Sequence, residues 1–225
     1  MARRGVMGVL GGAVVAVLGG CGLLFPNKFR FRMTIEVETP GGLRRSSAVY
    51  GVWANDKARL LPDEAARDWG VKGEALVIEL QDGPVFALLK TGNPLRDDLA
   101  KMSMAALDPE FRNDIVESAR RIAGSWSTRE GEVARADWPM MVRFRDINDP
   151  KSVEKVDPDA IGVKRIRLET TSDDVTTGIE NRLGWLAGKF EFFTPDSVHG
   201  MFIPPENLTI AHTLRRDSFS TEIGK

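Results

Sequence analysis

The clearest pattern along the chain is an alternation that begins after Pro26. Apolar side chains stand at every second position of residues 29–37, and polar or charged ones stand between them. A period of two over about ten residues predicts a strand with one buried and one solvated face. Pro40-Gly41-Gly42 predicts a turn, and residues 47–54 predict a second strand that pairs with the first as a hairpin.

A second hairpin is predicted further along the chain. Residues 74–80 and 85–90 are apolar runs compatible with strands, and Gln81-Asp82-Gly83-Pro84 between them predicts a tight turn. Between the two hairpins, residues 56–71 are polar and indicate a loop, with at most one helical turn at 63–69. The first half of the chain is therefore expected to be rich in strands.

A helix is predicted next, to cover a face of the sheet. Asp108 is expected to be its N-cap, because an aspartate there can accept a hydrogen bond from a free backbone N–H, and Pro109 suits the first helical position. Gly124 predicts its end. Four apolar residues share one face of this helix: Phe111, Ile115, Ala119 and Ile122.

Alternation returns at residues 138–146 and 162–170, which predicts two more strands. Thr177-Gly178-Ile179-Glu180 has the pattern of a capping box and predicts a short helix that runs through Leu186. The aromatic and proline-bearing stretch that follows predicts irregular structure packed on the core, with a candidate last strand at 208–214.

These elements predict an α+β fold in which antiparallel hairpins form a sheet and a few helices cover it. The 225 residues are ample for one such core. Three parts are expected: a signal or anchor segment at 1–25, a single α+β domain at 26–214 and a loose C-terminal tail at 215–225.

The N-terminal segment indicates a location. Two arginines at positions 3 and 4 precede a run, residues 5–25, that carries no charge. Such a run has the layout of an export signal and is also just long enough to cross a bilayer as a helix. Within it, Leu18-Gly19-Gly20-Cys21 resembles the lipobox of bacterial lipoproteins, and this resemblance implies that Cys21 is the lipid attachment site.

Two alternatives to a lipoprotein stay open. In an uncleaved membrane helix, Cys21 would be merely one small apolar residue; the other alternative is full secretion or a cytoplasmic protein. A lipid anchor and an uncleaved helix both place the domain in the bacterial cell envelope, held at a membrane and facing the periplasm. We therefore expect a membrane, and an envelope protein, as the partners.

Composition excludes several classes of function. The net charge of −1 lacks the positive balance of a protein whose main partner is nucleic acid. The single cysteine rules out an internal disulfide framework and a multi-cysteine metal site, and two histidines leave few ligands for zinc. A glycine-rich phosphate loop is also missing from the sequence. We assign no catalytic residue, and we expect neither a cofactor nor a metal ion.

Two pairs of carboxylates are nevertheless candidates for chemistry. In Arg145-Asp146-Ile147-Asn148-Asp149-Pro150, oxygen ligands at alternate positions could bind calcium, and the stretch looks like the linker motif of cadherins. A turn in which Asn148 and Asp149 bind their own backbone explains the same residues. Asp173 and Asp174 could do acid–base work or hold a metal, and they could equally solubilise a loop.

The histidines and the outward arginines also allow both a functional and a structural interpretation. Asp196-Ser197-Val198-His199-Gly200 brings three catalytic residue types together, but a triad is normally built from residues far apart in the chain, so we interpret His199 as a surface residue. His212 is interpreted as structural. Outward arginines could form a basic stripe for an anionic lipid or a polyanion, whereas the glutamates between them favour a mixed, solvated face. These arginines are Arg30, Arg32, Arg143, Arg145, Arg165 and Arg167.

Three blocks of the chain, residues 31–40, 144–150 and 175–180, together resemble an uncharacterised family of short proteins from Gram-negative bacteria. Its members typically carry an N-terminal anchor or a lipoprotein signal. The resemblance implies an envelope location and no particular chemistry.

Two hypotheses of function follow. The first is a membrane-anchored envelope domain that acts as a non-enzymatic binding or structural module. The second is a carboxylate-dependent envelope hydrolase or metal-dependent enzyme. It requires the four candidate carboxylates to converge in one cleft, with a histidine near them.

Overall fold

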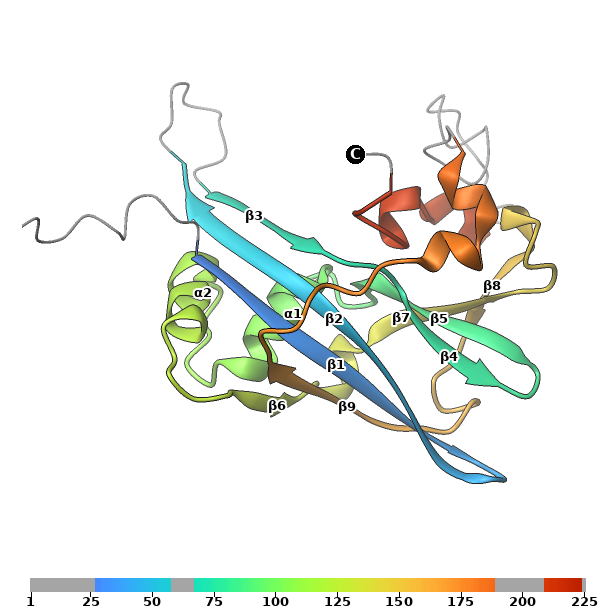
Figure 1. Ribbon diagram of the computed structural model, residues 1–225, viewed down its shortest axis with the longest axis horizontal. Helices are drawn as coiled ribbons and strands as arrows, with labels where there is room; N and C mark the ends of the chain where they lie inside the picture. The colour runs from blue at the N-terminus through green and yellow to red at the C-terminus, as the bar shows by residue number, and fades with distance from the viewer. Residues whose placement is uncertain (1–26, 58–66, 189–208, 224–225) are drawn as a thin grey trace, which may run out of the picture.

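The computed structural model describes residues 27–57, 67–188 and 209–223, and Cys21 and His199 lie outside these ranges. The described chain forms two antiparallel sheets and two α-helices, which confirms the α+β class (Figure 1). Sheet 1 contains, in spatial order, β3 (Arg67–Lys72), β2 (Gly42–Asp56), β1 (Asn27–Thr39), β9 (Val163–Thr170) and β6 (Glu130–Glu132). Sheet 2 contains β4 (Leu76–Leu80), β5 (Gly83–Thr91), β7 (Pro139–Phe144) and β8 (Val153–Val156).

The predicted first hairpin is confirmed and is longer than expected. β1 pairs with β2 along its whole length, from Asn27 opposite Ala54 to Thr39 opposite Gly42. Gly42 has a φ of +102°, a conformation that glycine adopts without strain, and it begins β2 directly after the turn. The other edge of β1 pairs with β9, so β1 is the central strand of sheet 1.

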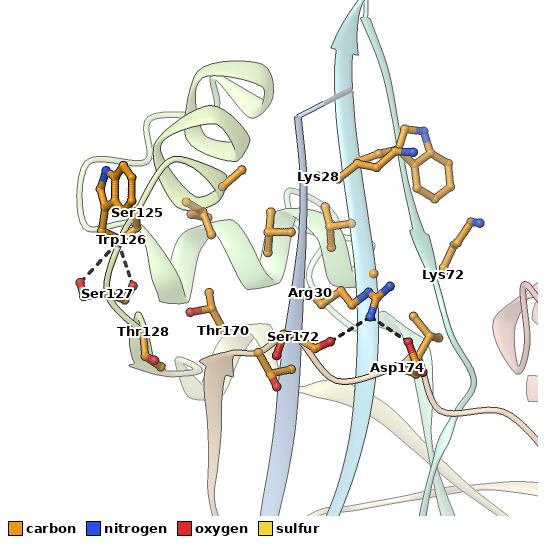
Figure 2. Close-up of a pocket in the computed structure, with 18 of the residues that line it drawn as sticks. Lys28, Arg30, Lys72, Ser125, Trp126, Ser127, Thr128, Thr170, Ser172 and Asp174 are labelled. Carbon is orange, nitrogen blue, oxygen red and sulfur yellow. Dashed lines mark hydrogen bonds and ion pairs between the residues drawn. The ribbon is translucent and has the colours of Figure 1, made fainter. Parts of the chain in front are cut away.

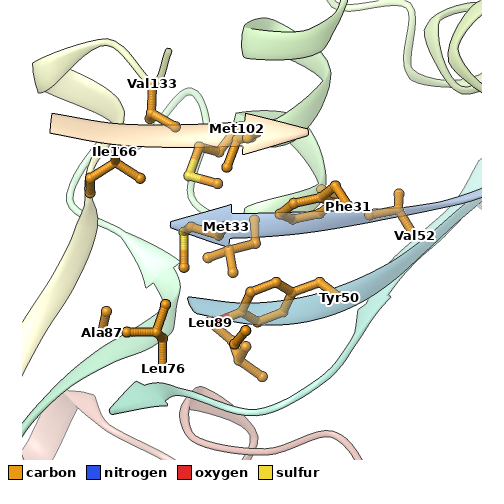
Figure 3. Close-up of a cluster of buried hydrophobic side chains, with 14 of the residues drawn as sticks. Phe31, Met33, Tyr50, Val52, Leu76, Ala87, Leu89, Met102, Val133 and Ile166 are labelled. Atoms are coloured by element: carbon orange, nitrogen blue, oxygen red, sulfur yellow. The ribbon is translucent and has the colours of Figure 1, made fainter. Parts of the chain in front are cut away.

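The main core lies between the inner face of sheet 1, one face of sheet 2 and the two helices. Figure 3 shows Phe31 and Met33 of β1 facing Leu76 and Leu89 of sheet 2, and the Phe31 ring stacks on the Tyr50 ring at a centroid distance of 5.2 Å. Every second residue of β1 is buried here, as the alternation predicts. Each large apolar side chain removed from water in this way contributes about 1.5–3 kcal/mol.

Sheet 2 is the middle layer of the molecule, because its interior strand β5 is buried on both faces. Ala87 and Leu89 face the main core, whereas Phe86 and Leu88 belong to a second core on the opposite side. The predicted hairpin of β4 and β5 is confirmed, with Leu80 paired to Gly83 across the turn. A strand buried on both faces needs a cover on each side, and the C-terminal part of the chain supplies the second cover.

The four apolar residues predicted to share one helix face are all buried, but the predicted boundaries of the helix are wrong. α1 (Leu99–Leu107) and α2 (Ile115–Ala123) replace the single helix expected from Asp108. Asp108 instead follows the end of α1, and its carboxylate accepts a hydrogen bond from Arg121 at 2.6 Å. The N-cap of α2 is Asp114, whose Oδ1 accepts from the Glu117 N–H at 3.2 Å. Neither these helices nor any other in the described part of the chain has the length and apolar run that a membrane crossing requires.

The C-terminal part of the chain packs on the outer face of sheet 2, which corrects three expectations. In place of one capped helix after Thr177, the chain forms two short 3-10 turns, Ile179–Asn181 and Gly184–Ala187, and Thr177 makes no capping bond to them. A 3-10 turn, Ile210–Thr213, stands where the last strand was expected. The tail is not loose as far as it is described, because Phe219 is fully buried against sheet 2.

Short elements account for the other differences from the sequence analysis. β3 forms in a segment that was predicted to be a loop, where it pairs with β2 as an edge strand. β6 and β8 were not predicted at all, because three or four residues are too few for a recognisable alternation. The stretch 189–208, expected to be irregular, lies outside the described residues.

The contact between β6 and α1 gives a first prediction. A Cβ atom at Gly131 would lie 1.9 Å from the Ala106 carbonyl oxygen, so Gly131→Ala must push the strand and the helix apart. We expect the free energy of unfolding to fall by at least about 1–3 kcal/mol in denaturant titrations. The matched control is Gly92→Ala, because nothing lies within 4 Å of a Cβ atom there. Equal stability of the two variants would contradict the described packing.

The burial of the tail gives a second prediction. Phe219→Ala should lower the free energy of unfolding by about 3–5 kcal/mol, because it leaves a cavity in the second core. Leu95→Ala serves as control, since Leu95 is exposed and its loss should change stability by no more than about 0.5 kcal/mol. A tail that is loose in solution would make the two variants alike.

Candidate functional site

A groove of about 1010 Å³ lies at one end of sheet 1 (Figure 2). Six parts of the chain line it: the start of β1, the end of β2, the end of β3, the segment from Ile122 to Thr128 at the end of α2, the segment from Thr170 to Val175 after β9, and Glu222 near the C-terminus. Figure 1 places the start of β1, the end of β2 and α2 at the same end of the molecule. The groove is therefore assembled from segments far apart in sequence.

Two glycines at outward positions of sheet 1, Gly51 and Gly70, shape the surface at this groove. Gly70 in β3 pairs with Trp53 in β2, and a Cβ atom at Gly70 would lie 2.4 Å from the Trp53 ring. The indole therefore lies over the backbone of β3. Gly51 lies two residues before Trp53 in β2 and pairs with Lys72 of β3. A Cβ atom at Gly51 would lie 3.5 Å from a methyl group of Val175. A larger side chain at Gly51, which lines the groove, would occupy part of its floor, and one at Gly70 would displace the Trp53 ring.

One wall of the groove is residues 171–176, here called the strap, which run across the outer face of sheet 1. The strap is held at one end by the Thr171 N–H, which donates to the Arg30 carbonyl oxygen at 3.0 Å. At the other end Thr176 exchanges two hydrogen bonds with the backbone of Val49, at 3.0 and 2.9 Å. The Arg30 guanidinium donates to the carbonyl oxygens of Ser172 and Asp173 and to the Asp174 carboxylate.

The groove combines two free lysines with an exposed tryptophan. Lys28 and Lys72 are exposed, and within the described ranges neither forms an ion pair. Trp126 is fully exposed at the edge of the groove and stands apart from Lys28 and Lys72 in Figure 2. Arg30 also lines the groove, but its charge is balanced by Asp174 at 3.0 Å. The lining also contains the Glu222 carboxylate, so three cations stand against two acids and the net charge is slightly positive. Trp126 adds one large apolar side chain open to solvent.

The outward arginines do not form one basic stripe, because the structure divides them between two sheets and pairs them with carboxylates. On sheet 1, Arg32 binds Glu169 at 2.7 Å and also Asp173, and Arg167 binds Glu130 at 3.2 Å. On sheet 2, Arg143 and Arg145 both bind Glu154, at 3.6 and 3.1 Å. The mixed face that the interleaved glutamates favour is the arrangement found.

Glu36 is the centre of the pairing at the far end of this face. Its carboxylate accepts from Arg165 at 2.6 Å and from Arg45 at 2.9 Å, although its side chain is buried. The hydrogen bond from Arg165, and then that from Arg45, lower the pKa of Glu36 to about 2. The sequence marked Glu36 only as a polar position of a strand, because its partners lie on two other strands.

The candidate carboxylates do not converge. Asp173 and Asp174 lie in the strap and bind arginines of β1. Asp146 and Asp149 follow β7 in sheet 2, where their side chains accept from the N–H groups of Asn148 and Lys151, each at 2.9 Å. These are the bonds of a turn, and the described residues contain no group of three or more acids, histidines or cysteines placed to hold a metal ion.

Two further titratable residues have structural surroundings. His212 contacts the N–H and the hydroxyl group of Thr209 through Nδ1, at 3.1 and 2.9 Å, and so caps its own 3-10 turn. Glu74, which the sequence analysis did not single out, is buried and accepts from the Ile179 N–H at 2.8 Å and from the Ser220 hydroxyl at 3.1 Å. Burial raises the pKa of Glu74. It joins the C-terminal tail to the segment after the strap.

Only part of the groove is recognisable from the sequence. Alternation predicts Arg30 as outward, and Asp174 is one of the candidate carboxylates, but no pattern pointed to Trp126, Trp53 or Lys72. One usable signal was Gly51 inside a predicted strand, since such a glycine often marks close approach of another segment. The position of Trp126 had no such signal, because nothing in the sequence links the end of α2 to sheet 1.

The ion pairs of Glu36 give a prediction for acid stability. A carboxylate with a lowered pKa contributes stability above its ordinary pKa of 4.5, and this contribution is lost as pH falls toward about 2. Glu36→Gln should therefore be less stable than the unchanged chain at pH 7, and the difference should shrink between about pH 4.5 and 2 in denaturant titrations. Glu132→Gln, an exposed change in β6 of the same sheet, is the control. A difference for Glu36→Gln that does not vary with pH would contradict the pairing.

The groove is thus the candidate functional site of the described chain. Comparison of the chain with protein-family models, with curated proteins and with solved structures gives no match.

Proposed function

We propose that this chain is a protein of the bacterial cell envelope, held at a membrane through residues 1–25, and that its α+β domain faces the periplasm as a non-enzymatic binding module. The support for the location is the uncharged run 5–25 with its lipobox-like end at Cys21. Because β1 begins at Asn27, any anchor in that run joins the domain directly at sheet 1. The groove at the start of β1 is the proposed binding site.

The observation that carries the binding role is the exposed Trp126 beside a groove with two unpaired lysines. A large aromatic side chain at the edge of a concave surface is typical of sites that bind a partner or a ligand. Lys28 and Lys72 have no carboxylate partner in the described chain, whereas most cations along the same face do. Their charges are therefore available to an anionic group from outside.

The hypothesis of a carboxylate-dependent enzyme has no comparable observation in its favour. Asp173 and Asp174 bind Arg32 and Arg30, and Asp146 and Asp149 hold a turn on the other sheet. Each of the four is accounted for by a local structural role. The contacts of these carboxylates therefore favour a binding module over an enzyme.

Mass spectrometry of the native N-terminus tests the anchor. In a Gram-negative host, the full chain should be recovered with membranes and should begin at a lipid-modified Cys21, and Cys21→Ser should abolish that modification. An intact, membrane-bound N-terminus would support the uncleaved helix in place of the lipid. A chain found in the soluble fraction with residues 1–25 intact would refute the proposed location.

Thiol labelling tests the binding role of the groove. Ser127→Cys places a label site in the groove, and Leu95→Cys places one on exposed surface outside it. If the groove is occupied, Ser127→Cys should react several-fold more slowly in native envelopes than in purified chain, while Leu95→Cys reacts equally in both. Equal reactivity of both variants in envelopes and in purified form would contradict the binding module.

A further inference from the structure

We infer that the occupant of the groove is the anionic headgroup layer of the membrane that carries the anchor, so that the domain rests on the bilayer with the groove facing it. This inference rests on the proposed function, because it presupposes that residues 1–25 hold the chain at a membrane. It goes further by naming the partner and by fixing which face of the domain is turned toward the membrane.

The first argument is the length of chain between the anchor and the groove. Lys28 lines the groove and stands only three residues after Phe25, the last residue of the uncharged run. At no more than about 3.5 Å per residue, this spacing keeps its Cα atom within roughly 10 Å of that of Phe25. For a lipid on Cys21 the same limit is roughly 25 Å. In either case the groove end of sheet 1 is held next to the headgroups.

The second argument is how charge is distributed along the outer face of sheet 1. At the far end, Lys164 pairs with Glu38, and Glu36 pairs with arginines on both sides. At the groove end, Lys28 and Lys72 have no ion pair within the described ranges. The free positive charges thus lie where the chain meets the membrane. An anionic lipid surface attracts each such lysine enough to raise binding roughly fivefold.

The third argument is the pair of tryptophans. Trp126 is exposed at the groove, and Trp53 lies opposite Lys28 in the strand pairing with its ring partly exposed. Tryptophan is enriched at membrane interfaces, where its apolar ring and its N–H group suit the level of the headgroups. A free polyanion or a soluble protein would not require these residues to lie beside the anchor, but a bilayer does.

Fluorescence quenching in proteoliposomes tests the orientation. The full chain is reconstituted in phosphatidylethanolamine vesicles with or without about 30% phosphatidylglycerol, in each case with brominated acyl chains that quench nearby tryptophans. Two of the five tryptophans line the groove, so about a fifth to two-fifths of the fluorescence should be lost in anionic vesicles. Without phosphatidylglycerol the loss should be markedly smaller, and Trp126→Phe should remove at least half of it.

Charge-reversal variants separate the groove from general electrostatics. Lys28→Glu combined with Lys72→Glu should shift the ratio of docked to undocked domains by roughly tenfold or more toward undocked. The matched control reverses Lys151 and Lys155, two exposed lysines at the other sheet, and should leave quenching unchanged. All four side chains are exposed, so these changes spare the core.

Flotation of the same vesicles distinguishes the possible failures. A chain that does not float with the vesicles refutes the membrane anchor itself. A chain that floats but shows no quenching that depends on anionic lipid and on Trp126 refutes the docked orientation, while the anchor stands. If Ser127→Cys is nevertheless shielded in native envelopes, the occupant is an envelope glycan or protein, and the lipid inference is overturned.

Discussion

The structure depends on the two-residue period of β1, whose side chains alternate between two environments. β1 is the central strand of sheet 1. Its inner residues, such as Phe31 and Met33, lie in the main core. Its outer residues form ion pairs, and one of them, Arg30, binds the strap that forms a wall of the groove. A slip of one residue would exchange the two faces and place charges in the core. The apolar pattern that fixes the fold therefore also decides which cations point toward the groove.

The layering of the molecule explains the path of the C-terminal part of the chain. Sheet 2 is covered by the main core on one face, so the apolar residues on its other face need a second cover. The chain reaches that face through the strap, which crosses sheet 1 and is tied down by Arg30. Glu74 then bonds to Ile179 and Ser220 and joins the two segments that complete the cover. A structural requirement of sheet 2 thus brings a wall of the groove into place.

Features of the fold that depend on neighbouring residues were predicted from the sequence, whereas features that depend on contacts between distant residues were not. The two hairpins and β9 were predicted because alternation and turn residues are local. Asp108 was misassigned because a capping side chain looks the same before a helix and after one, and the contact with Arg121 that decides its role is not local. Phe219 was assigned to a loose tail because its partners are in sheet 2. The groove was beyond prediction for the same reason, since the six parts of the chain that line it meet only in the folded chain.

The central claim is that the groove end of sheet 1 faces the membrane, and lysine footprinting measures this most directly. The full chain is treated with a water-soluble acylating reagent in native membranes and, separately, after extraction in detergent, and each lysine is quantified by mass spectrometry. We expect Lys28 and Lys72 to be protected in membranes, and Lys151 and Lys155 to react equally in both states. Equal reactivity of all four lysines in membranes and in detergent would contradict the account.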